Sequence, residues 1–194
     1  MNGKERVKLA FAHQEADRIP VMALTIDNPT AAHVLERPNL SGFGGRVRGV
    51  AQNKALMEGN YIEYQRQKLV DEIELYRTLD LDCWGEANPI PRNPLVPEQV
   101  EENAWRFTDP ATGLWRLYRF MPESDAYDQV DSSLRQEGLP ALERLTEEME
   151  AGTPSLEDWD FTFVDMAIRE MGDWRDYLAQ QSETKSFDRV YCMV

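Results

Sequence analysis

Gly3-Lys-Glu-Arg-Val-Lys-Leu-Ala-Phe-Ala-His-Gln-Glu-Ala-Asp-Arg-Ile-Pro-Val-Met22 is the stretch that says most about the fold of this chain. It predicts a short helix, a polar connector and then a strand. Asn2 stands where it can cap the helix, and Glu5 lies three residues on, where its side chain can reach back to the Asn2 N–H. The apolar run at 19–24 has Pro20 near its start, where a missing N–H disturbs a sheet least. We therefore expect a helix that leads into a buried strand.

Further helices and strands are predicted along the chain. The clearest helix covers residues 61–79 and leads into a second candidate strand at 79–84. Shorter signals predict helices at 28–35, with Asn28 as the cap, at 139–149 and at 156–179, and an apolar strand at 187–194. Helices that alternate with buried strands predict a parallel sheet flanked by helices. The predicted buried face of the clearest helix consists of Ile62, Leu69, Ile73, Tyr76 and Leu79.

Three stretches predict loops or peripheral structure. Residues 88–97 contain four prolines, which favour an extended surface crossing. Bulky and polar residues alternate on either side of Asp109-Pro-Ala-Thr-Gly113, which predicts a peripheral β-hairpin at about 104–121. The glycine-rich stretch at 41–45 lacks the lysine and the spacing of a phosphate-binding loop, so we expect a flexible turn.

Composition and charge restrict the class of protein. The chain has 194 residues, of which 42% are hydrophobic, and this is enough for one good-sized domain with a core. Its net charge of −14 disfavours nucleic acid and anionic membrane surfaces as partners. The polar start of the chain, the lack of a long apolar run and the presence of only two cysteines, Cys83 and Cys192, predict a cytoplasmic protein.

The opening stretch resembles the start of the uroporphyrinogen decarboxylase family. The resemblance rests on the Lys4-Glu-Arg-Val7 helix and on His13-Gln-Glu-Ala-Asp-Arg-Ile-Pro-Val21, and it continues more loosely through 31–35 and 71–82. The family consists of (β/α)8 TIM barrels, which need eight strands and about 250 residues. The resemblance implies an α/β fold in which residues 1–194 form a single partial barrel domain, the N-terminal part of the barrel with an added hairpin.

The resemblance also implies a function. The family reaction is the loss of CO2 from acetate side chains of a tetrapyrrole without a cofactor. Two alternatives stay open: a corrinoid-linked methyltransferase of the same family, which would use zinc and a corrinoid protein, and a non-catalytic acidic binding or assembly module. An open half-barrel has an unpaired edge, so a homodimer is one way to cover it.

The chain departs from the decarboxylase pattern at two places. Where the decarboxylase carries an Arg-x-x-x-Arg loop for substrate carboxylates, this chain has Thr-Ile-Asp-Asn-Pro at 25–29. No aspartate stands at 87–89, where the family has its key aspartate. A substrate with eight carboxylates needs guanidinium partners, so a chain without these arginines is poorly suited to bind it.

Candidate site residues follow from their position in a barrel, where chemistry collects after the C-terminal ends of the strands. We expect Glu86, next to Trp84, to act as a general acid whose pKa is raised by desolvation. His13, His33, Cys83 and Cys192 do not have metal-site spacing, so no metal site is expected in this segment. The candidate substrate-binding residues are Asp27, Asn28, Arg46, Arg48 and Asn88.

Overall fold

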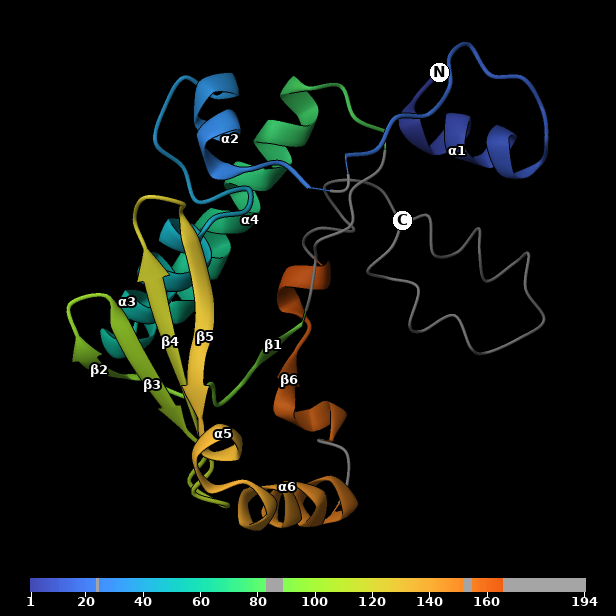
Figure 1. Ribbon diagram of the computed structural model, residues 1–194. Coiled ribbons are helices and arrows are strands. Elements are labelled where there is room, and N and C mark those ends of the chain that lie inside the picture. Colours follow the sequence, from blue (N-terminus) through green and yellow to red (C-terminus); the bar gives the residue numbers. More distant parts are fainter. Residues whose placement is uncertain (24, 83–88, 152–154, 166–194) are drawn as a thin grey trace. The chain divides into compact units, whose positions relative to one another are not determined.

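The computed structural model describes residues 1–23, 25–82, 89–151 and 155–165, and its contacts divide the chain into two compact units (Figure 1). The first unit consists of Met1–Gly42, Gln65–Ile90 and Phe161–Val194, and the second consists of Phe43–Tyr64 and Pro91–Asp160. Helix α4 (Tyr61–Thr78) begins in the second unit and continues in the first.

The first unit contains two short helices before α4. Helix α1 (Gly3–Phe11) confirms the predicted capping box: Glu5 N donates to Asn2 Oδ1 and Asn2 N donates to Glu5 Oε2, both at 2.9 Å. Helix α2 (Asn28–Val34) begins where it was predicted, but Asn28 is not its cap. Asp27 has the extended backbone of a cap residue and accepts a hydrogen bond from Thr30 N at 3.0 Å, which makes Asn28 the first helical residue.

Helix α4 buries a different set of residues from the one its sequence predicts, with Tyr64 and Leu75 added to the buried face. Leu69, Ile73 and Tyr76 are buried as expected, whereas Ile62 and Leu79, at the two ends of the predicted face, are exposed. The same helix buries Asp71, whose carboxylate accepts hydrogen bonds from the Arg37 guanidinium and Leu40 N. These bonds supply the partners that a buried carboxylate requires.

The strand predicted at 19–24 is wrong for the residues that the structure describes there. Only Met22 takes part in a bridge, and Ile19 is 85% exposed. The described part of the strand predicted at 79–84 is a turn and a bend. The two segments nevertheless lie side by side, because Asp82 N donates to Val21 O and Val21 N donates to Asp82 Oδ2, both at 2.8 Å. The Asp82 carboxylate thus accepts the hydrogen bond that a backbone carbonyl of a neighbouring strand would accept. Pro20 has no N–H, so the strand pairing cannot continue through it.

The second unit is built on an antiparallel sheet of four strands in sequence order: β2 (Glu98–Glu101), β3 (Ala104–Thr108), β4 (Trp115–Met121) and β5 (Ala126–Ser132). The predicted hairpin at 104–121 is confirmed as β3 and β4. The prediction missed β2 and β5, so the hairpin is the centre of a larger sheet. Trp105 and Phe120 lie in the core of this unit.

Helices flank this sheet. The π-helix η1 (Arg46–Ala51) continues into α3 (Gln52–Met57) and packs on β4 and β5. After the sheet come α5 (Ser133–Glu137) and α6 (Leu139–Ala151), and α6 confirms the acidic helix predicted at 139–149. Along α6 the apolar side chains of Leu139, Leu142 and Met149 are exposed.

The helix predicted at 156–179 is wrong at its start. A 3-10 turn, η2 (Leu156–Asp158), leads into β6 (Trp159–Asp160), which forms a two-residue pair with β1 (Ile90–Pro91). The remainder of that predicted helix from 166 onward, the strand predicted at 187–194 and both cysteines lie outside the described residues. The (β/α)8 barrel and the single-domain organisation stay predictions.

The glycine-rich turn at 41–45 is tied to the tip of the β4–β5 hairpin. Gly45 N donates to Asp125 O at 2.6 Å, and Arg46 N donates to Asp125 Oδ1 at 2.9 Å. A Cβ on Gly44, whose φ is +147°, would overlap the Asp125 carboxylate. The glycines therefore permit a close approach between two loops, and the turn is held in place rather than flexible.

Candidate functional site

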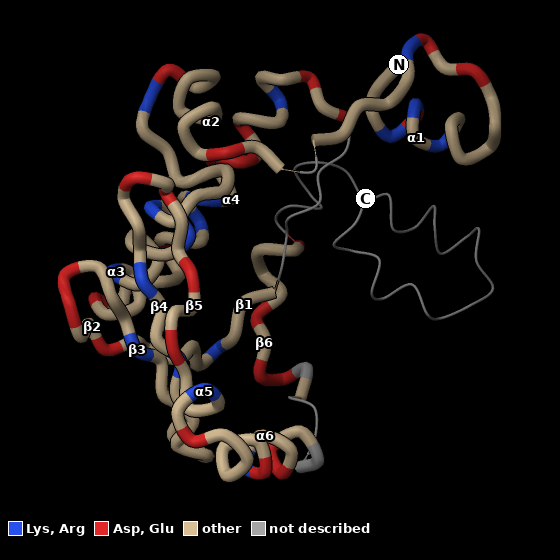
Figure 2. Tube along the Cα trace, viewed as in Figure 1, with Lys and Arg blue, Asp and Glu red and all other residues tan. Residues whose placement is uncertain are grey.

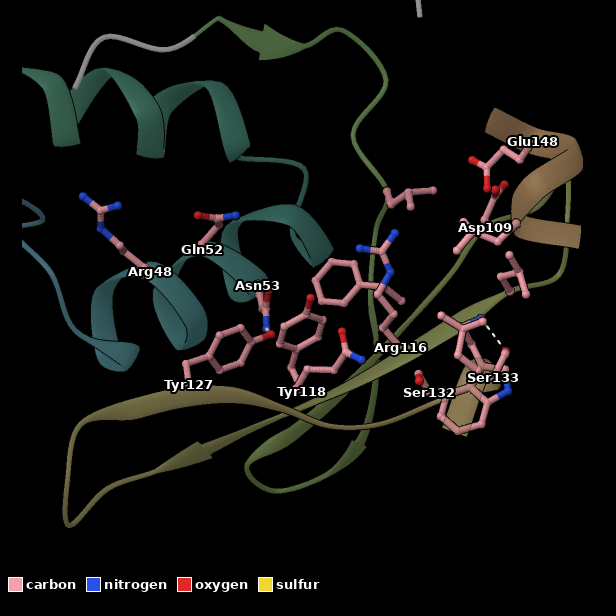
Figure 3. Close-up of a pocket in the computed structure, with 17 residues that line it drawn as sticks. Arg48, Gln52, Asn53, Asp109, Arg116, Tyr118, Tyr127, Ser132, Ser133 and Glu148 are labelled. Atoms are coloured by element: carbon pink, nitrogen blue, oxygen red, sulfur yellow. Dashed lines mark hydrogen bonds between the residues drawn. The ribbon is translucent and has the colours of Figure 1, made fainter. Parts of the chain in front are cut away.

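A cavity of about 580 Å³ opens on the sheet of the second unit and is lined by residues of that unit alone (Figure 3). One wall is aromatic and comes from β3, β4 and β5. A second wall comes from η1 and α3, and the far end is formed by the start of α5 and by α6. The volume lies within the ~300–1,000 Å³ that is usual for small-molecule sites.

The aromatic wall follows from strand alternation. In the β3–β4 pair Trp105 lies opposite Tyr118, and Phe107 lies opposite Arg116, so these four side chains share one face of the sheet. The Phe107 and Tyr118 rings meet edge to face with their centroids 5.7 Å apart. The ring of Tyr127, from β5, stacks on Tyr118 at 5.3 Å. The sheet thus presents three aromatic rings in contact, an arrangement that favours a flat apolar ligand.

The helical wall meets the sheet at Tyr127. Asn53, on α3, is buried, and its Nδ2 donates to Tyr127 Oη at 2.6 Å. Gly49, on η1, faces the Tyr127 ring so closely that a Cβ there would overlap it. Burial raises the pKa of Tyr127 above its ordinary value, although the bond from Asn53 acts in the opposite direction. Tyr127 is therefore a neutral phenol at pH 7 and keeps its O–H proton as a donor.

Asp109 and Glu148 bring two carboxylates to one end of the cavity. Asp109 Oδ1 accepts from Ala111 N at 2.8 Å, and its Oδ2 accepts from Thr112 Oγ1 at 2.9 Å. The Ala111 N–H is the main reason that the pKa of Asp109 is lowered, and the Thr112 hydroxyl acts in the same direction. The Asp109 carboxylate is thus engaged in holding the β3–β4 turn.

Two buried serines stand at the same end. Ser132 caps α5 by accepting a hydrogen bond from Arg135 N at 3.3 Å. The Ser133 hydroxyl accepts from Trp115 N at 2.8 Å and so joins the start of α5 to β4. These contacts fix the backbone at the far end of the cavity.

Arg116 is the cation at the middle of the lining. Figure 3 shows Arg116 with Tyr118 and Tyr127 on one side and Asp109 and Glu148 on the other. Among the described residues its guanidinium has neither a hydrogen-bond partner nor an ion-pair partner. This contrasts with Arg119, three positions after Arg116 on β4, which pairs with Glu101 at 2.9 Å.

A second cluster of charged residues lies in the first unit. Arg6 Nη1 and Arg18 Nη1 each contact the Asp82 carboxylate at 2.8 Å, and Arg6 Nε contacts Asp17 at 2.7 Å. Burial acts to raise the pKa of Asp82, but the Val21 N–H and the two arginines outweigh it, so the pKa is lowered. The Arg6 hydrogen bond likewise holds the pKa of Asp17 well below its usual range. This cluster fixes the connector between α1 and residue 22.

The structure places the predicted site residues in local roles. Asp27 caps α2, and Asn28 Nδ2 donates to Asn39 O at 3.1 Å and Ser41 O at 2.8 Å, all within the first unit. Arg46 begins η1 in the second unit. None of these side chains lines the cavity. Glu86 and Asn88 lie outside the described residues.

Among the predicted site residues that the structure describes, Arg48 alone lines the cavity. Its guanidinium, however, lies over the Phe43 ring, 3.4 Å from the centroid, and Figure 3 shows it directed away from Tyr127. It therefore contributes its stem to the wall and directs its charge elsewhere.

The sequence predictions missed Asn53, Arg116, Tyr118 and Tyr127. The alternation within the predicted hairpin could have placed Arg116 and Tyr118 on one face. No local signal joins Asn53 to Tyr127, which follows it 74 residues later.

Among the described residues, no group of three or more His, Cys, Asp or Glu side chains is arranged to hold a metal ion. Nor does any helix in those residues have the length and apolar character that crossing a membrane requires. Comparisons of the chain with protein-family models, with curated proteins and with solved structures found no match.

Proposed function

We propose that this chain is a uroporphyrinogen-decarboxylase-family protein that supplies the first part of a barrel and acts as a tetrapyrrole-related carboxy-lyase. The observation that carries the proposal is the way the opening stretch is held. Asp17 and Arg18 belong to the stretch that resembles the family, and together with Arg6 they form one ion cluster around Asp82.

This cluster joins two segments that the resemblance would place side by side, although neither forms a strand among the described residues. The family resemblance assigns Val21 to the first barrel strand and Asp82 to the second, and successive parallel strands of a barrel are neighbours. Val21 and Asp82 exchange two hydrogen bonds of 2.8 Å. The side-by-side arrangement of these segments supports the proposal, and the reaction itself rests on the resemblance.

Methyl transfer is the second candidate function, because one observation counts against a tetrapyrrole with eight carboxylates. Binding of a substrate with eight carboxylates calls for available guanidinium groups. Arg6 and Arg18 are engaged with aspartates, and residues 25–29 contain no arginine. The described residues contain no ligand set for the zinc that methyl transfer would use.

Two assays on the purified chain separate the candidates. Anaerobic incubation with uroporphyrinogen, followed by oxidation and chromatography, should yield porphyrins with fewer carboxyl groups, because each lost CO2 is replaced by a proton. In the parallel assay, with methylcobalamin, zinc and a thiol, decay of the methylcobalamin spectrum would instead identify methyl transfer. If the protein, confirmed as folded by circular dichroism, gives neither product above a blank without protein, the carboxy-lyase proposal is wrong and a non-catalytic acidic binding module takes its place.

A further inference from the structure

We propose that the cavity of the second unit is a binding site for a planar heteroaromatic ring that carries one anionic group. The site lies outside the ion cluster on which the proposed function rests, and its chemistry is argued from the cavity alone. Three properties of the lining lead to this ligand class: the aromatic wall, the amide groups and the unpaired arginine.

The aromatic wall selects a ring. Phe107, Tyr118 and Tyr127 contact one another and line a cavity of about 580 Å³. Offset-stacked and edge-to-face contacts with such a wall add to the favourable burial of a ring. The wall is positioned by the sheet and by the Asn53–Tyr127 bond, so it exists before a ligand arrives.

The side-chain amides of the lining favour a ring that has hydrogen-bonding groups along its edge. Asn53 is buried and donates through Nδ2 to Tyr127, which leaves its carbonyl Oδ1 without a donor among the described residues. Gln52 and Gln129 also line the cavity, and within the part of the chain described here their side chains form no hydrogen bonds. An amide offers both a donor and an acceptor, so these groups match the N–H, N and C=O edge of a heterocycle better than a hydrocarbon ring.

The unpaired arginine selects an anion. Arg116 is opposite Phe107 in the register, so its guanidinium stands beside the aromatic wall. A planar guanidinium binds a carboxylate or phosphate through two parallel hydrogen bonds. A cationic ligand would need acidic partners, and the lining has two acids, Asp109 and Glu148. The Asp109 carboxylate already accepts hydrogen bonds from its own turn, so a cation fits less well than an anion.

Three small molecules test these properties separately. Quinoline-2-carboxylate has the ring, the heteroatom and the anion; quinoline lacks the anion; cyclohexanecarboxylate lacks the ring. Binding is measured on the whole chain by saturation-transfer NMR and by titration of tryptophan fluorescence. We expect saturable binding of quinoline-2-carboxylate, weaker binding of quinoline and no binding of cyclohexanecarboxylate.

Matched variants assign the effect to residues. Arg116→Gln should weaken quinoline-2-carboxylate about tenfold, the scale of one hydrogen bond to a charged group, and leave quinoline unchanged. Arg119→Gln, on the opposite face of the same strand, should bind as the unchanged chain does. Tyr118→Phe should retain the ring contact, whereas Tyr118→Leu should weaken both quinolines.

Several results would overturn the proposal. These are the absence of saturable binding at millimolar probe, equal affinity for quinoline and quinoline-2-carboxylate, or an equal loss in Arg116→Gln and Arg119→Gln. Arg116 is exposed, so its variant should keep the circular dichroism spectrum of the parent, and the test does not depend on the more buried Tyr118. Failure of this test leaves the catalytic assays unaffected, because those assays address the first unit and its family resemblance.

Discussion

Asp80 and Asp82 both contact Arg18, and they differ mainly in burial. The Asp80 side chain is 84% exposed and lies 2.9 Å from Arg18, whereas the Asp82 side chain is 1% exposed and also binds Arg6. An exposed ion pair contributes little because water and salt screen it. A buried charge without a partner strongly destabilises the fold. The two aspartates therefore allow the effect of burial to be compared within one cluster.

Replacing Asp82 should be far more destabilising than replacing Asp80. Asp82→Asn removes the charge that neutralises two arginines and is expected to lower the free energy of unfolding by about 3 kcal/mol. Asp80→Asn should cost less than about 0.5 kcal/mol. Urea denaturation followed by circular dichroism measures both, and equal losses would contradict the role assigned to burial.

The ion cluster around Asp82 predicts that the fold loses stability at low pH. The Arg6 hydrogen bond lowers the pKa of Asp17, and the pKa of Asp82 is also lowered. A depressed folded pKa contributes stability above the unfolded value, which is about 4 for aspartate, and that stability is lost as the pH falls further. We expect a constant free energy of unfolding from pH 7 to about 5 and a decline below about pH 4. The decline should be shallower in Asp17→Asn, and an identical pH profile would exclude a contribution from this carboxylate.

At the scale of elements, η1 is held against β5 by the contact between Gly49 and the Tyr127 ring. Alanine is normally preferred over glycine in a helix by about 1 kcal/mol. At this position the added methyl group would overlap a ring that is itself fixed by Asn53. In a Gly49→Ala variant, helix propensity would therefore raise the stability of the protein, and packing against Tyr127 would lower it.

Packing should prevail at Gly49. Gly49→Ala is expected to destabilise the second unit by about 1–3 kcal/mol, as overpacked sites do. In a Tyr127→Ala background the ring is gone, and the same substitution should become neutral or stabilising. Thermal or urea unfolding of the four proteins of this double-mutant cycle gives the coupling, and an additive result would show that the ring is not the obstacle.

The sequence predicted elements better than their arrangement. Helices α1, α4 and α6 and the β3–β4 hairpin follow from local periodicity and turn residues. The apolar run at 19–24 predicted a strand, but an apolar run does not reveal what pairs with it, and here the Asp82 side chain takes that position. Strand β5 carries Asp128, Gln129 and Asp131 and so lacked an apolar pattern.

The cavity was beyond sequence prediction for a related reason. It joins Asn53, on a helix, to Tyr127, on a strand 74 residues later, and only the tertiary fold brings them together. The predicted site residues were chosen for their position after barrel strands. Of those that the structure describes, Asp27 and Asn28 support the backbone of the first unit, and Arg48 lines the cavity only with its stem.

At the scale of the molecule, charge is the dominant property. The net charge is −14, and Figure 2 shows acidic residues gathered on α6 and spread over the hairpins, with basic residues interspersed. Such a field repels polyanions at a distance.

The chain should therefore fail to bind nucleic acid and anionic lipid. At 0.15 M salt we expect no retardation of duplex DNA in a gel and no co-sedimentation with phosphatidylserine vesicles, because phosphate contacts need clustered Lys and Arg. Zwitterionic vesicles are the matched control for the lipid experiment. A salt-sensitive DNA shift would reveal a local basic surface that the net charge conceals.

The contact between the glycine-rich turn and Asp125 has a practical consequence for engineering. Hairpin tips are usually the safest places to insert a peptide tag or a circular-permutation break, since they extend into solvent. The β4–β5 tip is an exception, because its Asp125 is hydrogen-bonded to Gly45 N and Arg46 N. An affinity tag or fluorophore placed at 122–125 would separate two loops that fit together only because Gly44 has no side chain.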